Sequence, residues 1–69
     1  MYLVKYDLEG QTTLIHSGND EVAARQALQR KLFAEPHKIL GMIDLANGYK
    51  LRLKRVGYVG VAELSLQQI

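Results

Sequence analysis

A short basic run, residues 50–55 with the sequence KLRLKR, holds the residue types best suited to binding chemistry. Cations alternate with leucines along most of it, and a period of two is typical of a β-strand with two unlike faces. In such a strand Lys50, Arg52 and Lys54 stand on one face, about 7 Å apart. A row of positive charges at this spacing could follow the phosphates of a nucleic acid or an acidic protein surface. The run therefore predicts a surface for an anionic partner.

Three more residues join this candidate binding set. Arg55 extends the charge, and Tyr49 and Tyr58 flank the run in sequence, where they could stack on nucleic-acid bases. A regular strand turns Tyr49 to the face opposite the lysines. The same alternation is also shown by a solvated strand face, or by a charged sheet edge that resists aggregation. Both interpretations stay open at this point.

Residues suited to catalysis or metal binding are few. The chain has two histidines, His16 and His37, and no cysteine. Ser17 and Asp20 lie near His16, but adjacent residues on a strand end point to opposite sides, and no oxyanion motif accompanies them. Two distant histidines do not supply the converging ligands of a metal site, so we expect both at the surface. We expect a protein that is not an enzyme, with no catalytic residues, no metal and no cofactor.

Chain length and charge further limit the possible folds and functions. The 69 residues predict a single small domain, residues 1–69, and a chain of this length buries only about 60% of the surface that its unfolded form exposes. Small domains without disulfides often depend on a partner or on self-association. The net charge of +2 is uneven, because residues 1–35 have four cations against five carboxylates and residues 36–69 have five against two. The basic excess therefore lies in the second half.

Membrane and export signals are missing from the sequence. No segment approaches the run of about 20 apolar residues that a membrane-spanning helix needs. The first residues, MYLV, lack the charged start and the apolar core of a signal peptide. We therefore expect a cytoplasmic protein that makes no membrane contact.

One helix is predicted, over residues 21–34, which are rich in Ala, Leu, Gln, Arg and Lys. The polar run SGND at residues 17–20 offers side-chain oxygens to the free N–H groups of a first turn. Its Ser-x-x-Asp spacing fits a capping box, but a glycine would then open the helix, so we favour Asn19 as the cap. Pro36 ends the helix, because its ring disfavours helical backbone in the residue before it.

The predicted buried face of this helix holds small and apolar residues. It comprises Ala24, Ala27, Leu28 and Leu32, which lie within about 140° of arc. Lys31 intrudes on this arc, and its long side chain can extend to solvent. Val22 and Phe33 fall on the far side, so either a second flank of the helix is covered or they pack at its ends.

The remaining elements are strands. Before the helix, residues 2–7 and 12–16 alternate on either side of Gly10, which can take a positive φ, so they predict an antiparallel hairpin. After the helix come residues 39–45, 49–56 and 61–66, separated by an Asn47-Gly48 turn and by a turn from Gly57 to Gly60. The order β-β-α-β-β-β predicts an α+β fold, with a single helix packed on one face of an antiparallel sheet.

Residues 39–45 differ from the other strands, because both alternating sets are apolar. One set is Ile39, Ile43 and Leu45, and the other is Leu40 and Met42. A strand covered on both faces shows this pattern. A single helix covers only one face of a sheet, so we expect the open face to meet a partner or to form a homodimer. Scattered exposed apolar groups are the alternative.

The opening hairpin that feeds a capped helix resembles many small proteins of phages and mobile elements, including some anti-CRISPR inhibitors and antitoxin-like folds. The resemblance is architectural and implies a nucleoprotein complex of the host as partner. We therefore favour a small non-catalytic interaction protein that docks on and modulates a larger macromolecular partner, such as an anti-CRISPR-like inhibitor. The alternative is a nucleic-acid-binding protein that uses the basic strand, although a net charge of +2 is low for that class.

Overall fold

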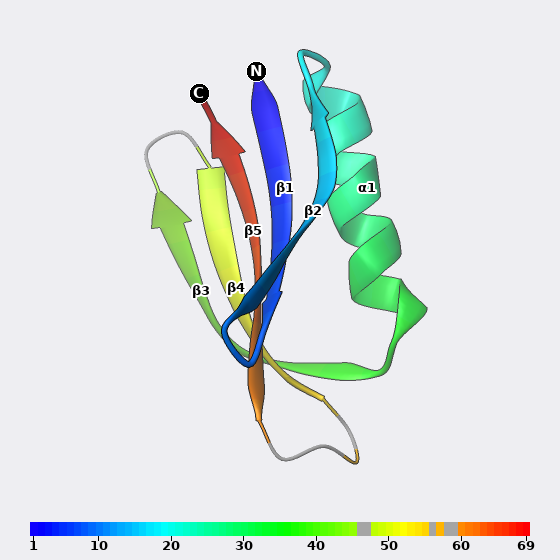
Figure 1. The fold of residues 1–69 in the computed structure, drawn as a ribbon, viewed down its shortest axis with the longest axis vertical. Coiled ribbons are helices and arrows are strands. Elements are labelled where there is room, and N and C mark those ends of the chain that lie inside the picture. Colours follow the sequence, from blue (N-terminus) through cyan, green and yellow to red (C-terminus); the bar gives the residue numbers. More distant parts are fainter. Residues whose placement is uncertain (46–47, 56, 58–59) are drawn as a thin grey trace.

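The computed structural model describes residues 1–45, 48–55, 57 and 60–69. These residues form one antiparallel sheet with a helix on one of its faces (Figure 1). The elements are β1 (Tyr2–Leu8), β2 (Gln11–Gly18), α1 (Glu21–Ala34), β3 (His37–Leu45), β4 (Gly48–Arg55) and β5 (Val61–Gln68). The predicted α+β fold and its β-β-α-β-β-β order are therefore confirmed, and the helix has the predicted bounds.

The last strand lies at the centre of the sheet. The strand order is β2-β1-β5-β4-β3, and every neighbouring pair is antiparallel. β1 and β5 pair along their whole length, from Tyr2 opposite Gln68 to Leu8 opposite Ala62. The two chain ends therefore lie side by side (Figure 1), and the amide of Ile69 donates to the carbonyl of Met1 at 2.7 Å. β2 and β3 form the two edges.

A two-residue turn joins β1 to β2. Glu9 and Gly10 both have positive φ, 54° and 82°, as a type I′ hairpin turn requires. The Asp7 carboxylate supports the turn, since it accepts from the amide of Gly10 at 3.1 Å and from the Thr12 hydroxyl at 3.0 Å. The predicted hairpin and the positive φ of Gly10 are confirmed.

The helix is capped by Asp20, so the prediction of Asn19 is wrong. The Asp20 backbone is extended, and its Oδ1 accepts from the amides of Val22 at 2.9 Å and Ala23 at 3.4 Å. These are the amides at the second and third helical positions, which have no carbonyl partner inside the helix. A carboxylate also suits the positive end of the helix dipole better than the neutral amide of asparagine.

The core lies between α1 and the central part of the sheet. α1 packs against β1, β2 and β5. Among the described residues the core side chains are Val4, Tyr6, Ala24, Leu28, Leu51, Leu53, Ala62, Leu64 and Leu66. Leu51 and Leu53 are inward, as predicted, and Tyr49 packs beside them, partly buried. Of the predicted helix face, Ala24 and Leu28 are buried, while Ala27 and Leu32 are partly exposed.

β3 is an exposed edge strand, so the prediction that the chain itself covers a face of this strand is wrong, while coverage by a partner stays a prediction. α1 packs over β1, β2 and β5, away from β3 (Figure 1), and no described element packs over the outer edge of β3. The exposed fractions of its large apolar residues run from 40% to 67%, for Ile39, Leu40, Met42, Ile43 and Leu45. On the helix, Val22 and Phe33 are also exposed.

Two predicted turns fall largely outside the described residues. One is the turn before β4, which contains Asn47, and the other is the turn before β5, which contains Tyr58. Gly48, at the start of β4, is described, and a Cβ there would overlap the carbonyl of Leu66. A glycine is therefore needed where β4 approaches β5. In the described part of the chain, no helix has both the length and the apolar character to span a membrane.

Candidate interaction surfaces

The basic run lies on β4, where its cations Lys50, Arg52 and Lys54 stand on the sheet face turned away from α1. Lys50, Arg52 and Lys54 alternate there with the buried Leu51 and Leu53, as predicted. We call this the open face, because no described element packs over it. β4 is flanked by β5 and β3, so the three cations do not form a charged sheet edge. They stand one strand inside an edge that is itself apolar.

Strand pairing adds a fourth cation to this surface. Lys38 of β3 lies directly opposite Lys54 of β4. A bulge between Ile39 and Gly41 shifts the register of β3, and this shift brings Lys38 to the same face as Lys54. We define the basic patch as Lys38, Lys50, Arg52 and Lys54. The sequence could not reveal Lys38 as a member, because membership depends on the pairing and on the bulge.

Carboxylates limit the charge on one side of the basic patch. The Nζ of Lys50 lies 3.2 Å from Oε2 of Glu63 on β5, and both side chains are about 40% exposed. An exposed ion pair of this kind contributes little stability. Glu63 also lies directly opposite Arg52. The uncompensated positive charge therefore lies toward β3.

Arg55 and Tyr49, two further members of the predicted set, lie on the helix face. An Arg55 guanidinium nitrogen is 2.9 Å from Oε2 of Glu35. The ring of Tyr49 lies under the guanidinium of Arg25, 5.7 Å from centroid to Cζ. Neither residue joins the basic patch, and Tyr58 lies outside the described residues. The structure thus divides the predicted set between the two faces of the sheet.

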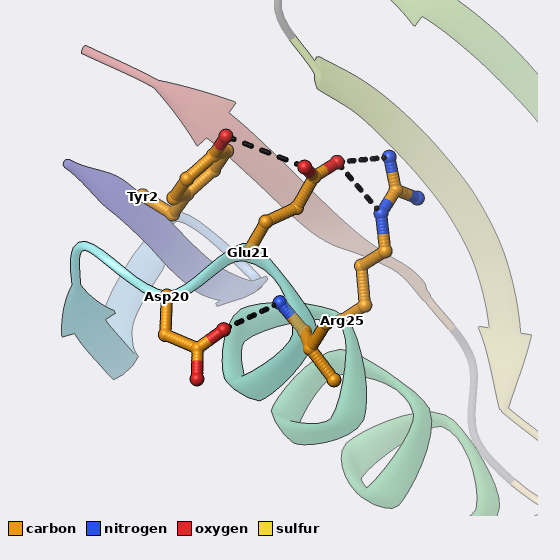
Figure 2. Close-up of polar contacts among 5 residues, drawn as sticks. Tyr2, Asp20, Glu21 and Arg25 are labelled. Carbon is orange, nitrogen blue, oxygen red and sulfur yellow. Dashed lines mark hydrogen bonds and ion pairs between the residues drawn. The ribbon is translucent and has the colours of Figure 1, made fainter.

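A polar network at the start of α1 fixes the arginine that covers Tyr49. Figure 2 shows Glu21 between Arg25 and Tyr2. Arg25 donates two hydrogen bonds to Oε1 of Glu21, at 3.1 and 3.2 Å, and the Tyr2 hydroxyl donates to Oε2 at 3.5 Å. Because Arg25 is held above the Tyr49 ring, this tyrosine does not offer a free surface for stacking on a base.

The end of the helix contains a cluster of polar side chains that the sequence did not predict. His37, expected at the surface, has a side chain only 1% exposed, and its Nε2 lies 3.7 Å from Oε2 of Glu35. Lys31 Nζ lies 3.8 Å from Oε1 of Glu35 and 4.5 Å from the centroid of the Tyr6 ring. Burial raises the pKa of Tyr6, the charge of Glu35 adds to the rise, and Arg55 opposes it.

The residues that could have suggested catalysis are otherwise engaged or apart. The Asp20 carboxylate caps the helix, while His16 pairs with Val4 in the β1–β2 hairpin. No three described histidine, aspartate or glutamate side chains gather closely enough to hold a metal ion. The exposed cations of the open face and the exposed apolar residues of the β3 edge form the two candidate interaction surfaces.

Comparison with known proteins adds no relative to this description. No protein-family model matches the chain, and neither a search of curated proteins nor a search of solved structures found a match. The geometry of the two surfaces is therefore the basis for assigning a function.

Proposed function

We propose that this protein is a small non-catalytic interaction protein that docks on and modulates a larger macromolecular partner. The observation that carries the proposal is the β3 edge, which is exposed and apolar on both of its faces. An edge strand offers a row of unpaired backbone N–H and C=O groups, to which an extended segment of another protein can add as a further strand. Apolar side chains beside that row supply the burial that such binding needs.

The other edge strand, β2, supports docking through β3, because β2 is better protected than β3. β2 begins with the polar residues Gln11, Thr12 and Thr13, and α1 packs against this strand. Natural sheets protect their edges with polar residues or by covering them. The central residues of β3, which include Leu40 and Met42, are apolar and uncovered, and the bulge between Ile39 and Gly41 is the one protective feature described in this part of the strand. A host nucleoprotein complex as the partner stays a prediction from the sequence.

The proposal can be tested with a photo-crosslinking amino acid placed in β3. We would replace Met42, which is 67% exposed, and as a matched control Gln29, which is exposed on α1. Each variant is irradiated in lysate of the organism that carries the gene, and the products are identified by mass spectrometry. We expect position 42 to yield a discrete adduct with a larger partner, and position 29 to yield none.

Competition makes the result specific for the β3 surface. Excess unlabelled wild-type protein should abolish the adduct, while the variant Ile39→Thr/Met42→Thr/Ile43→Thr should not compete. The three residues are 49–67% exposed, so these changes should leave the fold intact. Adducts of equal yield at both positions, or competition by the triple variant, would count against docking through β3.

The basic patch supports a second candidate function, the binding of nucleic acid. Lys38, Arg52 and Lys54 are exposed on the open face, where they could contact phosphates. Proteins that bind single strands on an open sheet usually add aromatic side chains for stacking. The described residues of this face include no tyrosine, since Tyr2, Tyr6 and Tyr49 point to the helix side.

Fluorescence anisotropy tests this second candidate. Labelled single-stranded and double-stranded nucleic acids are titrated with wild-type protein and with Lys50→Ala/Arg52→Ala/Lys54→Ala, at low and physiological salt. Binding that weakens steeply with salt and disappears in the triple variant would support it. Absence of binding at low salt would exclude it.

A further inference from the structure

We propose that the β3 edge receives an extended segment of the partner in which acidic residues alternate with apolar ones. This inference rests on the proposed docking through β3 and names the chemistry of the docked segment. In an added strand, successive side chains point to opposite faces of the extended sheet. Around the bulge of β3 the two faces differ in character, because the open face holds cations and the helix face holds apolar side chains.

The open face beside β3 selects acidic residues. Arg52 lies directly opposite Gly41, and a Cβ built at Gly41 meets no atom within 4 Å. The missing side chain leaves open space between the exposed Arg52 and the outer edge. An added strand would lie two strand spacings, about 9.6 Å, from β4. Arg52 can cross this gap above Gly41 to meet a carboxylate on the added strand.

Toward the start of β3 the open face carries the same charge, whereas Ile43 and Leu45, farther along the strand, are apolar. Lys38 is on β3 itself, so its amine would lie next to an added strand, and Lys54 stands directly behind it. Within the described residues, neither lysine nor Arg52 makes an ion pair, whereas Lys50 already has Glu63. The charge that a partner could neutralise is therefore concentrated at the β3 edge.

The helix face beside β3 selects apolar residues. Ile39 and Met42 lie opposite Leu53 and Leu51, whose side chains are buried on that face. Ile39 and Met42 are themselves 53% and 67% exposed, because α1 does not extend over β3. Apolar side chains of an added strand would extend the core outward at this point. Alternation of acidic and apolar residues thus matches both faces over residues 38–42 of β3, while Ile43 on the open face and Asp44 on the helix face reverse the pattern beyond them.

A second copy of the chain fits this edge less well. Two antiparallel β3 strands related by a two-fold axis keep their open faces on the same side of the joined sheet. A pairing centred on Gly41 would bring both Arg52 side chains over the two glycines, with Lys38 and Lys54 of each copy on that same face. The like charges would repel one another, whereas an acidic strand neutralises them.

The test uses fluorescein-labelled synthetic peptides of nine residues, the length of β3. One peptide alternates Val with Glu, a second alternates Val with Lys, and a third is the Val/Glu peptide with N-methylated central amides. Affinity is measured by anisotropy, and the binding site is mapped by shifts of the backbone amide resonances of the protein. Sedimentation of the protein alone at the same concentrations reports self-association.

Two variants with equal charge changes test the role of the basic patch. Lys38→Gln/Arg52→Gln removes the cations at the edge. The control Lys5→Gln/Arg30→Gln removes two cations from β1 and α1, away from β3. We expect the Val/Glu peptide to shift resonances of β3 and to bind the edge variant about tenfold or more weakly than the control.

Several results would overturn the inference. Equal binding of the Val/Lys peptide, or of the N-methylated peptide, would exclude acidic strand addition. If sedimentation shows that the protein is a dimer, and the peptide binds only after this dimer dissociates, then the edge binds a second copy of the chain. A single-stranded oligonucleotide that displaces the peptide and binds more tightly would assign the patch to nucleic acid. If the inference fails in any of these ways while crosslinking at position 42 still succeeds, docking through β3 stands and only the chemistry of the segment is wrong.

Discussion

The ring of Tyr6 in β1 meets the ring of His37 in β3 edge to face, with centroids 6.5 Å apart and planes at 72°. β5 and β4 lie between these strands, and Tyr6 is in register with Met42 and not with His37, so a flat sheet would hold the two residues more than about 14 Å apart. The contact shows that the sheet coils, and that the start of β3 folds back toward the end of α1, as Figure 1 also shows. His37 thereby closes one end of the core.

Tyr6 should make stability depend on pH in the alkaline range. Its pKa is raised from 10.0, first by burial and then by Glu35. The tyrosine of the unfolded chain therefore ionises at lower pH than that of the folded protein, and folded stability is lost as pH rises through the folded pKa. Tyr6→Phe should remove this loss. Urea denaturation at intervals from about pH 8 to about pH 11 should show the wild type falling relative to the variant. Parallel curves would contradict the assignment.

The helix cap can be tested with a pair of neighbouring substitutions. Asp20→Ala removes the acceptor of two backbone amides and should lower the free energy of unfolding by about 0.5–2 kcal/mol. Asn19→Ala is the matched control and should change it by less than about 0.5 kcal/mol. Chemical denaturation measures both. A larger effect from Asn19 than from Asp20 would restore the cap that the sequence alone suggested.

Leu28 tests the orientation of the helix on the sheet. Its side chain is 2% exposed, and Leu28→Ala should cost about 2–5 kcal/mol, a large part of the stability of so small a domain. The exposed Val22→Ala is the control, with an expected change below about 0.5 kcal/mol. If Leu28→Ala fails to fold, Leu28→Val should give a smaller, measurable loss. A silent Leu28→Ala would show that another face of α1 packs on the sheet.

Reversing the charge of Lys54, which faces Lys38, should stabilise the protein. Lys38 and Lys54 lie directly opposite one another on β3 and β4, where like charges are unfavourable. Lys54→Glu should raise the free energy of unfolding above that of Lys54→Gln by about 0.2–1 kcal/mol, and the gain should shrink with salt. Lys5→Glu, opposite Ser65 and Leu14, is the control and should bring no such gain. Equal stability of the two Lys54 variants would show that a charge at position 54 does not interact with Lys38.

Each helix and strand was predicted from residue types and alternation within its own segment. The helix bounds follow from strong helix formers ended by Pro36, and the inward set of β4 follows from strict alternation in residues 50–55. These signals act within a few residues, so a single chain displays them fully. The cap was missed because three adjacent polar residues can each serve, and geometry alone separates Asp20 from Asn19.

The errors at β3 and in the binding set arise from pairing between distant residues. An apolar pattern on both sides of a strand predicts burial, but an exposed edge strand that binds a partner shows the same pattern. The choice depends on strand order, which no local signal in residues 39–45 contains. In the same way, Lys38 joins the basic patch only through the bulge before Gly41. Arg55 lies on the other face because strand alternation places it with Leu51 and Leu53, where it meets Glu35.

The central position of β5 also constrains the order in which this protein can fold. β5 joins β1 to β4, so the hairpin with its helix and the β3–β4 hairpin cannot share a sheet until residues 61–68 are available. During synthesis, the inner sides of β1 and β4 stay unpaired until the last strand leaves the ribosome. Because β1 and β5 are nearly a chain length apart, their pairing requires the costliest loop closure, and folding should be slow for a domain of this size.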